Sequence, residues 1–204
     1  YRNNGKGGFE DVSEASGVRG KRIRWASGCT FLDYDRDGFL DLFVANYIEL
    51  DLAKVPKPGE DPKCSWKGLP VMCGPRGLPG GSNILYHNRG DGTFEDASEA
   101  SGILSPGPTY SITAVAADFN NDLWPDVYVA VDSRPSLLFI NQRDGTFEES
   151  GMVAGCAFSE DGMEQAGMGV GVGDFNNDGW LDIFKTNFQH ESANLYQNNG
   201  DGTF

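Results

Sequence analysis

The sequence has few of the residues that enzymes most often use for nucleophilic, acid–base or redox chemistry. It contains two histidines and four cysteines among 204 residues, and neither His87 nor His190 stands beside a serine or cysteine in a nucleophile motif. No catalytic constellation is therefore visible. A carboxylate pair of the glycosidase type stays open as a less favoured alternative, because acidic residues are abundant and spacing alone does not pair them.

Basic residues and long apolar runs are also scarce. Sixteen lysines and arginines stand against 30 acidic residues, which leaves a formal net charge of −14. Such a field repels nucleic-acid phosphates and anionic lipids. No stretch approaches the roughly 18 apolar residues of a membrane-spanning helix. We therefore expect no nucleic-acid partner and no membrane span, and cations are the natural partners of this chain.

Helical patterns are missing as well. The chain has 28 glycines and 10 prolines, and no window sustains a 3.6-residue apolar period with caps at both ends. The sequence predicts an all-β protein. Two short motifs alternate instead, a Gly-rich hairpin sequence and an acidic loop sequence. The hairpin copies are 1–9, 85–94, 138–147 and 195–204, and the acidic copies are 33–44, 118–129 and 174–185.

Each pair of motifs predicts four short strands. The Asn/Gly/Asp/Gly turn supplies the residues with positive φ that a tight hairpin needs, which gives a strand on either side of the turn. Segments 27–32, 112–117 and 168–173 enter the acidic loops as strands, and 40–46, 126–131 and 181–187 leave them. Four-stranded repeats of this length are typical of β-propeller blades.

The motif spacing gives blade units at 1–84, 85–137 and 138–194, with a stub at 195–204. Unit one is longer because an insertion of roughly thirty residues, about 47–83, interrupts it as an irregular excursion. Three blades do not close a ring, since propellers have about four to eight. We therefore expect further blades, supplied by the same polypeptide or by neighbouring copies. The first source is favoured because residue 204 falls in the middle of a motif.

The acidic loops, named loop one (33–41), loop two (118–126) and loop three (174–182), place oxygen ligands at positions 1, 3, 5 and 9. With a backbone carbonyl at position 7, this spacing wraps a hard cation as the first part of an EF-hand loop does. Turn formation alone is the alternative, and three copies in one phase of the repeat disfavour it. The side-chain ligands are Asp33, Asp35, Asp37 and Asp41 in loop one, Asp118, Asn120, Asp122 and Asp126 in loop two, and Asp174, Asn176, Asp178 and Asp182 in loop three.

Calcium fits these loops best, with about three ions per chain. Mg²⁺ demands a tighter octahedron, and the absence of histidine and cysteine from the loops argues against zinc and copper. Loop two departs from the pattern, because Leu123 replaces the favoured glycine at position 6 and Pro125 replaces an apolar residue at position 8. We expect the turn of loop two to differ and its affinity to be lower.

The combined motifs resemble a known family. The acidic loops are similar to the calcium loops of FG-GAP repeats of the integrin α-subunit type. More closely, the chain resembles the cartilage-acidic-protein-like proteins of the ASPIC/UnbV group with VCBS/FG-GAP repeats. The segments that carry this resemblance are CGPRGLPG at 73–80, LYHNRGDGTFEDASEASGI at 85–103, QAGMGVGVGDFNNDGWLDIFKTNF at 165–188 and the DGTF turns.

The resemblance implies a seven-bladed, calcium-binding propeller that is secreted or exposed at the cell surface, with roles in adhesion or matrix contact. It also carries the ligand positions over to the loops named above, with Phe39, Trp124 and Trp180 giving the position-7 carbonyls. Nothing from the family's C-terminal region carries over. The partner would be a protein or a glycan, and its identity stays open.

The cysteines suggest one staple. Cys64 and Cys73 both lie in the insertion, where a loop without a core gains most from a disulfide, so we expect them to be paired. Cys29 and Cys156 are expected to be buried single thiols. Four free thiols in a reducing compartment are the alternative.

Arg89-Gly90-Asp91 spells an integrin-recognition tripeptide on a hairpin tip. Gly and Asp recur at the same turn elsewhere, which favours a turn over a recognition signal. The leading interpretation of the whole chain is therefore a calcium-stabilised extracellular interaction module. A subunit of a self-assembling filament or surface layer is the second alternative, and an enzyme that uses the propeller channel is the third.

Overall fold

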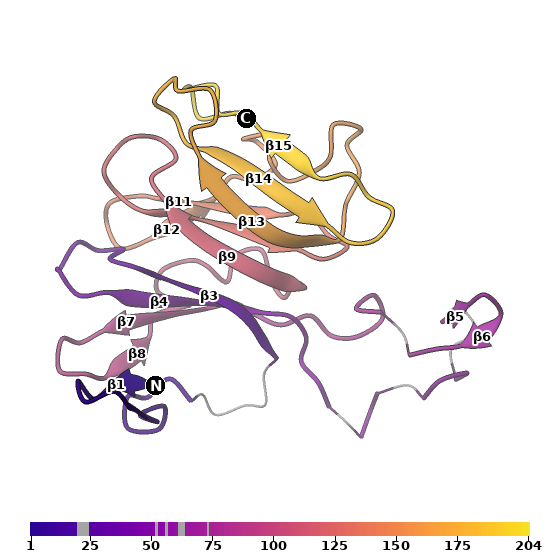
Figure 1. Ribbon diagram of the computed structural model, residues 1–204, viewed down its shortest axis with the longest axis horizontal. Coiled ribbons are helices and arrows are strands. Elements are labelled where there is room, and N and C mark those ends of the chain that lie inside the picture. Colours follow the sequence, from indigo (N-terminus) through magenta and orange to yellow (C-terminus); the bar gives the residue numbers. More distant parts are fainter. Residues whose placement is uncertain (20–24, 52, 56, 61–63, 73) are drawn as a thin grey trace.

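The computed structural model describes residues 1–19, 25–51, 53–55, 57–60, 64–72 and 74–204. Within these residues the chain forms fifteen strands and no helix, which confirms the all-β prediction. Most of the strands belong to three antiparallel sheets, which lie side by side in chain order (Figure 1). We call these sheets blade one, blade two and blade three.

The first two blades have four strands in the same order. Blade one contains β3 (Ala26–Leu32), β4 (Asp41–Asn46), β7 (Ile84–Asn88) and β8 (Phe94–Asp96). Blade two contains β9 (Ser111–Ala117), β10 (Asp126–Val131), β11 (Leu137–Asn141) and β12 (Phe147–Glu149). Blade three has three strands, β13 (Gly167–Gly173), β14 (Asp182–Asn187) and β15 (Asn194–Tyr196).

The sheets cross the boundaries of the sequence units 1–84, 85–137 and 138–194. β7 pairs with β4, so the hairpin sequence after each acidic loop completes the sheet of that loop. The hairpin at the start of the chain, β1 (Arg2–Asn3) with β2 (Phe9–Glu10), forms a small sheet of its own. A repeat in sequence leaves the phase of the sheets open, and hydrogen bonding between strands fixes it.

The insertion at 47–83 has a described segment, 64–72, that lies away from the blades (Figure 1). It contains a two-residue hairpin, β5 (Ser65–Trp66) with β6 (Leu69–Pro70). Its two ends meet at an isolated bridge between Ile48 and Gly80, and Gly81 bridges onward to Thr109 near blade two. The insertion is thus tied to the blades at its base.

The cysteines are only partly accounted for. Cys73 lies outside the described residues, so the pairing of Cys64 with Cys73 stays a prediction. Cys29 and Cys156 are free thiols, and Cys156 is buried as expected. The expectation of a buried Cys29 was wrong, because Cys29 lines an open cavity on the outer face of blade one.

Two apolar cores lie between the blades. Because successive side chains of a strand point to opposite faces, each blade offers one face to the blade before it and one to the blade after it. Between blades one and two, Phe43 and Leu85 pack with Phe139. Between blades two and three, Tyr128 packs with Ile183 and other side chains. These cores fix the blades relative to one another. The acidic loops at the ends of the blades are therefore fixed relative to one another too.

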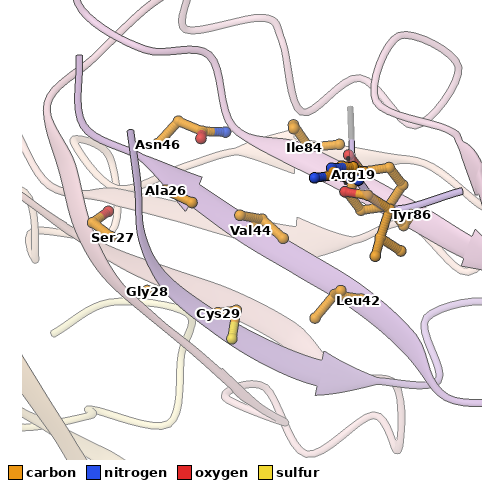
Figure 2. A pocket seen from close by; sticks show the side chains of 11 residues that line it. Arg19, Ala26, Ser27, Gly28, Cys29, Leu42, Val44, Asn46, Ile84 and Tyr86 are labelled. Carbon is orange, nitrogen blue, oxygen red and sulfur yellow. Dashed lines mark hydrogen bonds between the residues drawn. The ribbon is translucent and has the colours of Figure 1, made fainter. Parts of the chain in front are cut away.

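Among the described residues, the two outermost faces have no neighbouring sheet. On blade one a cavity of about 420 Å³ is lined by Leu42, Val44, Tyr86 and other residues, shown in Figure 2. On blade three Phe184 and Leu195 are 47% and 50% exposed. Their repeat equivalents in the other blades lie in the inter-blade cores. Both faces therefore have the chemistry of a blade interface without a neighbouring blade.

Candidate metal centres

Each acidic loop joins the first strand of a blade to its second strand, so the three loops lie in equivalent positions. The loops also contact one another. The guanidinium of Arg36 in loop one lies 5.4 Å from the ring centre of Trp124 in loop two. The side-chain amide of Asn121 in loop two donates a hydrogen bond to the carbonyl of Gly179 in loop three at 3.1 Å. The fold therefore gathers the predicted sites along one edge of the blades.

All three loops share one backbone conformation. Positions 4 and 6 have positive φ, which turns the intervening N–H groups toward the centre of the loop. Leu123 adopts at position 6 the conformation that glycine adopts in the other loops, so the expectation of a different turn in loop two was wrong. The φ values are 60° and 91° for Arg36 and Gly38, 55° and 72° for Asn121 and Leu123, and 59° and 91° for Asn177 and Gly179.

The aspartate at position 1 organises each turn. Its two carboxylate oxygens accept hydrogen bonds from the backbone N–H groups of positions 5 and 6, which closes the loop around the carboxylate. The bonds measure 3.1 and 3.1 Å at Asp33, 3.0 and 2.8 Å at Asp118, and 3.1 and 2.9 Å at Asp174. The same scaffold is thus built three times, in agreement with the repeat.

The oxygen donors of loop one converge. Carboxylate oxygens of Asp33, Asp35 and Asp37 all lie within 4.8 Å of one another. Calcium binds oxygen at about 2.3–2.6 Å, so two ligands on opposite sides of an ion are roughly 4.6–5.2 Å apart. These three carboxylates therefore fit one Ca²⁺. The role of the position-7 carbonyls of Phe39, Trp124 and Trp180 stays a prediction.

Loops two and three have an asparagine at position 3. Its side-chain oxygen accepts the backbone N–H of position 5, at 3.2 Å in loop two and 3.1 Å in loop three. Its side-chain nitrogen donates to the aspartate at position 5, from Asn120 to Asp122 at 3.0 Å and from Asn176 to Asp178 at 2.7 Å. Both loops therefore offer a carboxylate, an amide oxygen and a second carboxylate around the turn, a donor set suited to calcium.

The aspartate at position 9 is buried in every loop. Asp41, Asp126 and Asp182 are 0%, 0% and 1% exposed. Each accepts two backbone hydrogen bonds, as Asp126 does from Phe119 and Asn141, both at 2.9 Å. Burial nevertheless raises the pKa of Asp41 to about 6 and that of Asp126 to about 7. Burial thus disfavours the charged form of these two carboxylates, and a cation bound nearby would favour it.

An asparagine that the sequence analysis assigned only to the hairpin turn connects the loops. The side-chain amide of Asn141 donates to Pro125 in its own loop at 3.2 Å and to Tyr34 in loop one at 2.8 Å. Asn198 repeats this pattern, with 2.8 Å to Phe119 in loop two. Its recurrence in every hairpin motif was the available signal. In blades two and three it ties the acidic loop to the loop of the preceding blade.

His87 also belongs to a site, although it lies far from loop one in sequence. Its Nδ1 is 3.2 Å from Asp35 Oδ2 and 3.3 Å from Asp41 Oδ1. Although the loop sequences contain no histidine, the fold therefore brings one beside loop one. The signal was its register on the strand that pairs with β4. Ile140 and Gln197 occupy the equivalent positions in the other blades.

Loop two has a basic side chain beside it. Arg143, from the turn after β11, places Nε at 3.0 Å and Nη2 at 2.9 Å from Asp122 Oδ2. Although burial raises the pKa of Asp122, the N–H of Trp124 and the bond from Arg143 together hold this pKa below its ordinary value. The spacing of residues within the loops does not reveal this arginine, because it belongs to the hairpin that follows.

The Arg89-Gly90-Asp91 tripeptide is engaged within its own hairpin. Arg89 pairs with Glu95, with Nε at 3.2 Å from Oε2, and the Asp91 carboxylate accepts the hydroxyl of Thr93 at 2.6 Å. Among the described residues, no helix is long and apolar enough to cross a membrane.

Comparison with known proteins identifies the repeat. The family model described as an FG-GAP-like repeat matches residues 1–44, 74–129 and 118–185. Cartilage acidic protein 1 of Homo sapiens is 33% identical over 113 residues, which cover 55% of this chain and 16% of that protein. Cartilage acidic protein 1 of Mus musculus is 26% identical over 181 residues, 88% of this chain and 23% of that protein. The chain thus spans less than a quarter of these relatives.

One solved structure is also similar. Its title describes specific recognition of non-reducing terminal N-acetylglucosamine by an Agrocybe aegerita lectin. The likeness covers 100% of this chain and 58% of that chain at 18% identity, with a TM-score of 0.36, which is too low to support an argument. Neither the family description nor the names of the two relatives denotes an enzyme. The matched repeats extend over well over half of the sequence, and the chain belongs to the FG-GAP-like repeat family.

Proposed function

We propose that this chain is a calcium-binding propeller segment whose ions are structural and whose exposed loops bind a partner outside the cell. The observation that carries the proposal is the same oxygen-lined turn built three times, with the position-1 carboxylate held by two backbone N–H groups in each loop. Turns of this kind form without metal. Convergence of three carboxylates within 4.8 Å in loop one favours a cation over a bare turn.

The residues of each loop would play different parts in holding the ion. Side-chain oxygens at positions 1, 3, 5 and 9 would bind the ion, and the buried aspartate at position 9 would also fix the strand that leaves the loop. Calcium would supply positive charge among carboxylates that repel one another by up to roughly 4 kcal/mol per pair at 4 Å. It would also stabilise the folded chain, because a site formed only in the folded state adds its binding free energy to stability.

An extracellular location agrees with this chemistry. Extracellular calcium modules bind with dissociation constants of about 10⁻⁴–10⁻³ M, a range that partly exposed loops can reach. The relatives are named cartilage acidic protein 1, and the net charge of −14 makes this chain strongly acidic too. We therefore place the chain at the cell surface or in the secreted fraction. Its partner would be a protein or a glycan held by loops between the blades and by the insertion.

The exposed faces of blades one and three favour additional blades. Leu42 and Val44 on blade one are equivalent to Val127 and Val129, which blade one covers in blade two. Phe184 on blade three is equivalent to Phe43, which provides that cover. The two exposed faces therefore resemble the two halves of one blade interface. Further blades of the same polypeptide would cover them, and the second candidate function, a self-assembling filament or surface layer, would use neighbouring copies.

The calcium proposal is tested by titration and by thermal unfolding. Isothermal titration of the metal-free protein should show binding of about three Ca²⁺, and excess EDTA should lower the melting temperature. We expect Asp174→Ala to lower the calcium-dependent part of the stability more than Asp118→Ala does. The reason is that loop three has glycine at position 6 and that, among the described residues, no ion pair involves its aspartates.

Asp144→Ala is the matched control, because this exposed hairpin aspartate hydrogen-bonds only locally to Thr146. Its melting temperature should respond to calcium as the unmodified chain does. An unchanged melting curve in EDTA, together with no bound metal by elemental analysis, would refute the proposal. Concentration-dependent polymers in size-exclusion chromatography would favour the second candidate function.

A further inference from the structure

We infer that Arg143 is a built-in counter-cation of loop two, which competes with calcium there and makes site two the weakest of the three. This inference rests on the calcium binding proposed above and concerns how that binding is graded. Arg143 reaches the loop from the hairpin of the same blade, with two nitrogens within 3.0 Å of Asp122 Oδ2.

The other blades have no side chain at this hairpin position. Arg143 is equivalent to Gly90 in blade one and Gly200 in blade three, and all three have positive φ, at 64°, 74° and 74°. A Cβ atom on Gly90 would lie 2.7 Å from the ring of Phe39, and one on Gly200 would lie 2.8 Å from the ring of Trp180. In blades one and three the position-7 aromatic ring occupies this space, so a side chain there would require the ring to move.

The contact occupies an oxygen that calcium needs. Asp122 Oδ2 accepts hydrogen bonds from Arg143 and from the side-chain amide of Asn120, while Oδ1 accepts the backbone N–H of Trp124. The equivalent Oδ2 of Asp178 accepts the amide of Asn176 at 2.7 Å. Within the described part of the chain, no basic side chain forms an ion pair with Asp178. Site two thus already contains one positive charge.

Calcium and the Arg143 guanidinium compete for the same oxygen, Asp122 Oδ2. To bind calcium through Oδ2, loop two must break the Arg143 contact or hold a divalent ion beside a guanidinium, and like charges at this range repel strongly. The Asp122 side chain is 8% exposed, so water screens this repulsion less than at an open surface. Loss of one such ion pair corresponds to roughly a two- to fivefold change in affinity.

The test compares calcium titrations of three proteins. Arg143→Gly introduces the residue of the other two blades at a φ that glycine tolerates, so the hairpin should fold. Arg89→Gln is the matched control, because it removes the same charge from the hairpin of blade one, where Arg89 pairs with Glu95 and, among the described residues, with no loop aspartate. We expect two tighter sites and one weaker site in the unmodified chain, and roughly two- to fivefold tightening of the weak site in Arg143→Gly.

Adding Asp118→Ala to Arg143→Gly should abolish the tightened event, which would assign it to loop two. Three equal sites in the unmodified chain, or a shift in Arg143→Gly no larger than in Arg89→Gln, would overturn the inference and leave calcium binding standing. Absence of calcium binding in every protein would overturn the proposed function along with it.

Discussion

Loops two and three share the letters Asp-Phe-Asn-Asn-Asp and the same backbone hydrogen bonds, but their surroundings differ. In loop three the position-7 ring of Trp180 covers Gly200. In loop two Arg143 stands at the equivalent hairpin position, and the Trp124 ring contacts Arg36 of loop one instead. Near-identical loops can therefore present different electrostatic environments to the same ion.

Loops two and three show that the loop sequence determines the backbone conformation, whereas neighbouring residues determine the charge around the ion. The turn depends on local hydrogen bonds and on two residues with positive φ, so loop two keeps it even with Leu123 in place of glycine. Charge balance depends on the hairpin that follows in the same blade, because β11 pairs with β10 and brings Arg143 to the loop. Conformation is thus a property of the loop, and affinity is a property of the blade.

The largest expected effect on stability is the same for loops two and three. Asp126→Ala and Asp182→Ala should both destabilise the protein strongly, because each leaves two backbone N–H groups without their acceptor. At about 1–3 kcal/mol per unsatisfied buried group, the loss is roughly 2–6 kcal/mol for either variant. Denaturant unfolding in EDTA measures this loss without calcium.

The same two variants test whether the aspartate at position 9 acts through the metal. Similar losses in EDTA would show that position 9 supports the strands independently of metal. A loss that disappears in EDTA would show instead that the position-9 aspartates act only as ligands. Asp144→Ala again serves as the control, since its carboxylate is exposed and bonds within the hairpin.

Much of the fold could be predicted from the sequence. The alternation of Gly-rich hairpins and acidic loops predicted four-stranded units, because turn residues and apolar alternation act locally. The phase of the sheets could not be predicted this way, since pairing of β7 with β4 spans the whole insertion. The exposure of Cys29 likewise depends on which face of β3 has a neighbouring sheet.

The sites could be predicted in part. Ligand spacing identified the three turns, because a turn's hydrogen bonds join residues two to five positions apart. His87, Arg143 and Asn141 were not recognised as site residues, because they reach the loops through strand pairing. Placing the hairpin motif in register beside the acidic motif would have brought all three into view.

Blade three also differs from the other two blades at one strand position. Blade three has Lys185 where blades one and two have Val44 and Val129. Lys185 is 1% exposed, its Nζ lies 3.5 Å from Ser136 Oγ, and burial lowers its pKa to about 8. Lys185→Met, which keeps the length of the side chain, should stabilise the protein by up to roughly 3 kcal/mol at neutral pH.

The pH dependence gives this prediction its sign. Below about pH 8 the lysine is charged in both the folded and unfolded states, so the whole cost of burying the charge is present. As pH rises toward the ordinary lysine value of 10.5, the unfolded state also loses its proton and the cost disappears. The stability advantage of Lys185→Met should therefore shrink between pH 8 and 10.5. An advantage independent of pH would mean that packing, not charge, separates the two proteins.

The smallest expected effect concerns the one residue that distinguishes the loop sequences at position 6. Leu123 has a φ of 72° and is 74% exposed, so it pays for a left-handed conformation without burying its side chain. Leu123→Gly should therefore stabilise the chain by about 0.5–1 kcal/mol, after allowing for the greater freedom of glycine in the unfolded state. Gly179→Leu in loop three should lose a similar amount, and denaturant unfolding of both variants in EDTA measures the two effects without calcium. Calcium titration of Leu123→Gly then distinguishes backbone strain from the charge of Arg143 as the cause of weak binding at loop two. If backbone strain weakens site two, its affinity rises in this variant alone, and if Arg143 weakens it, the affinity stays low until that arginine is removed.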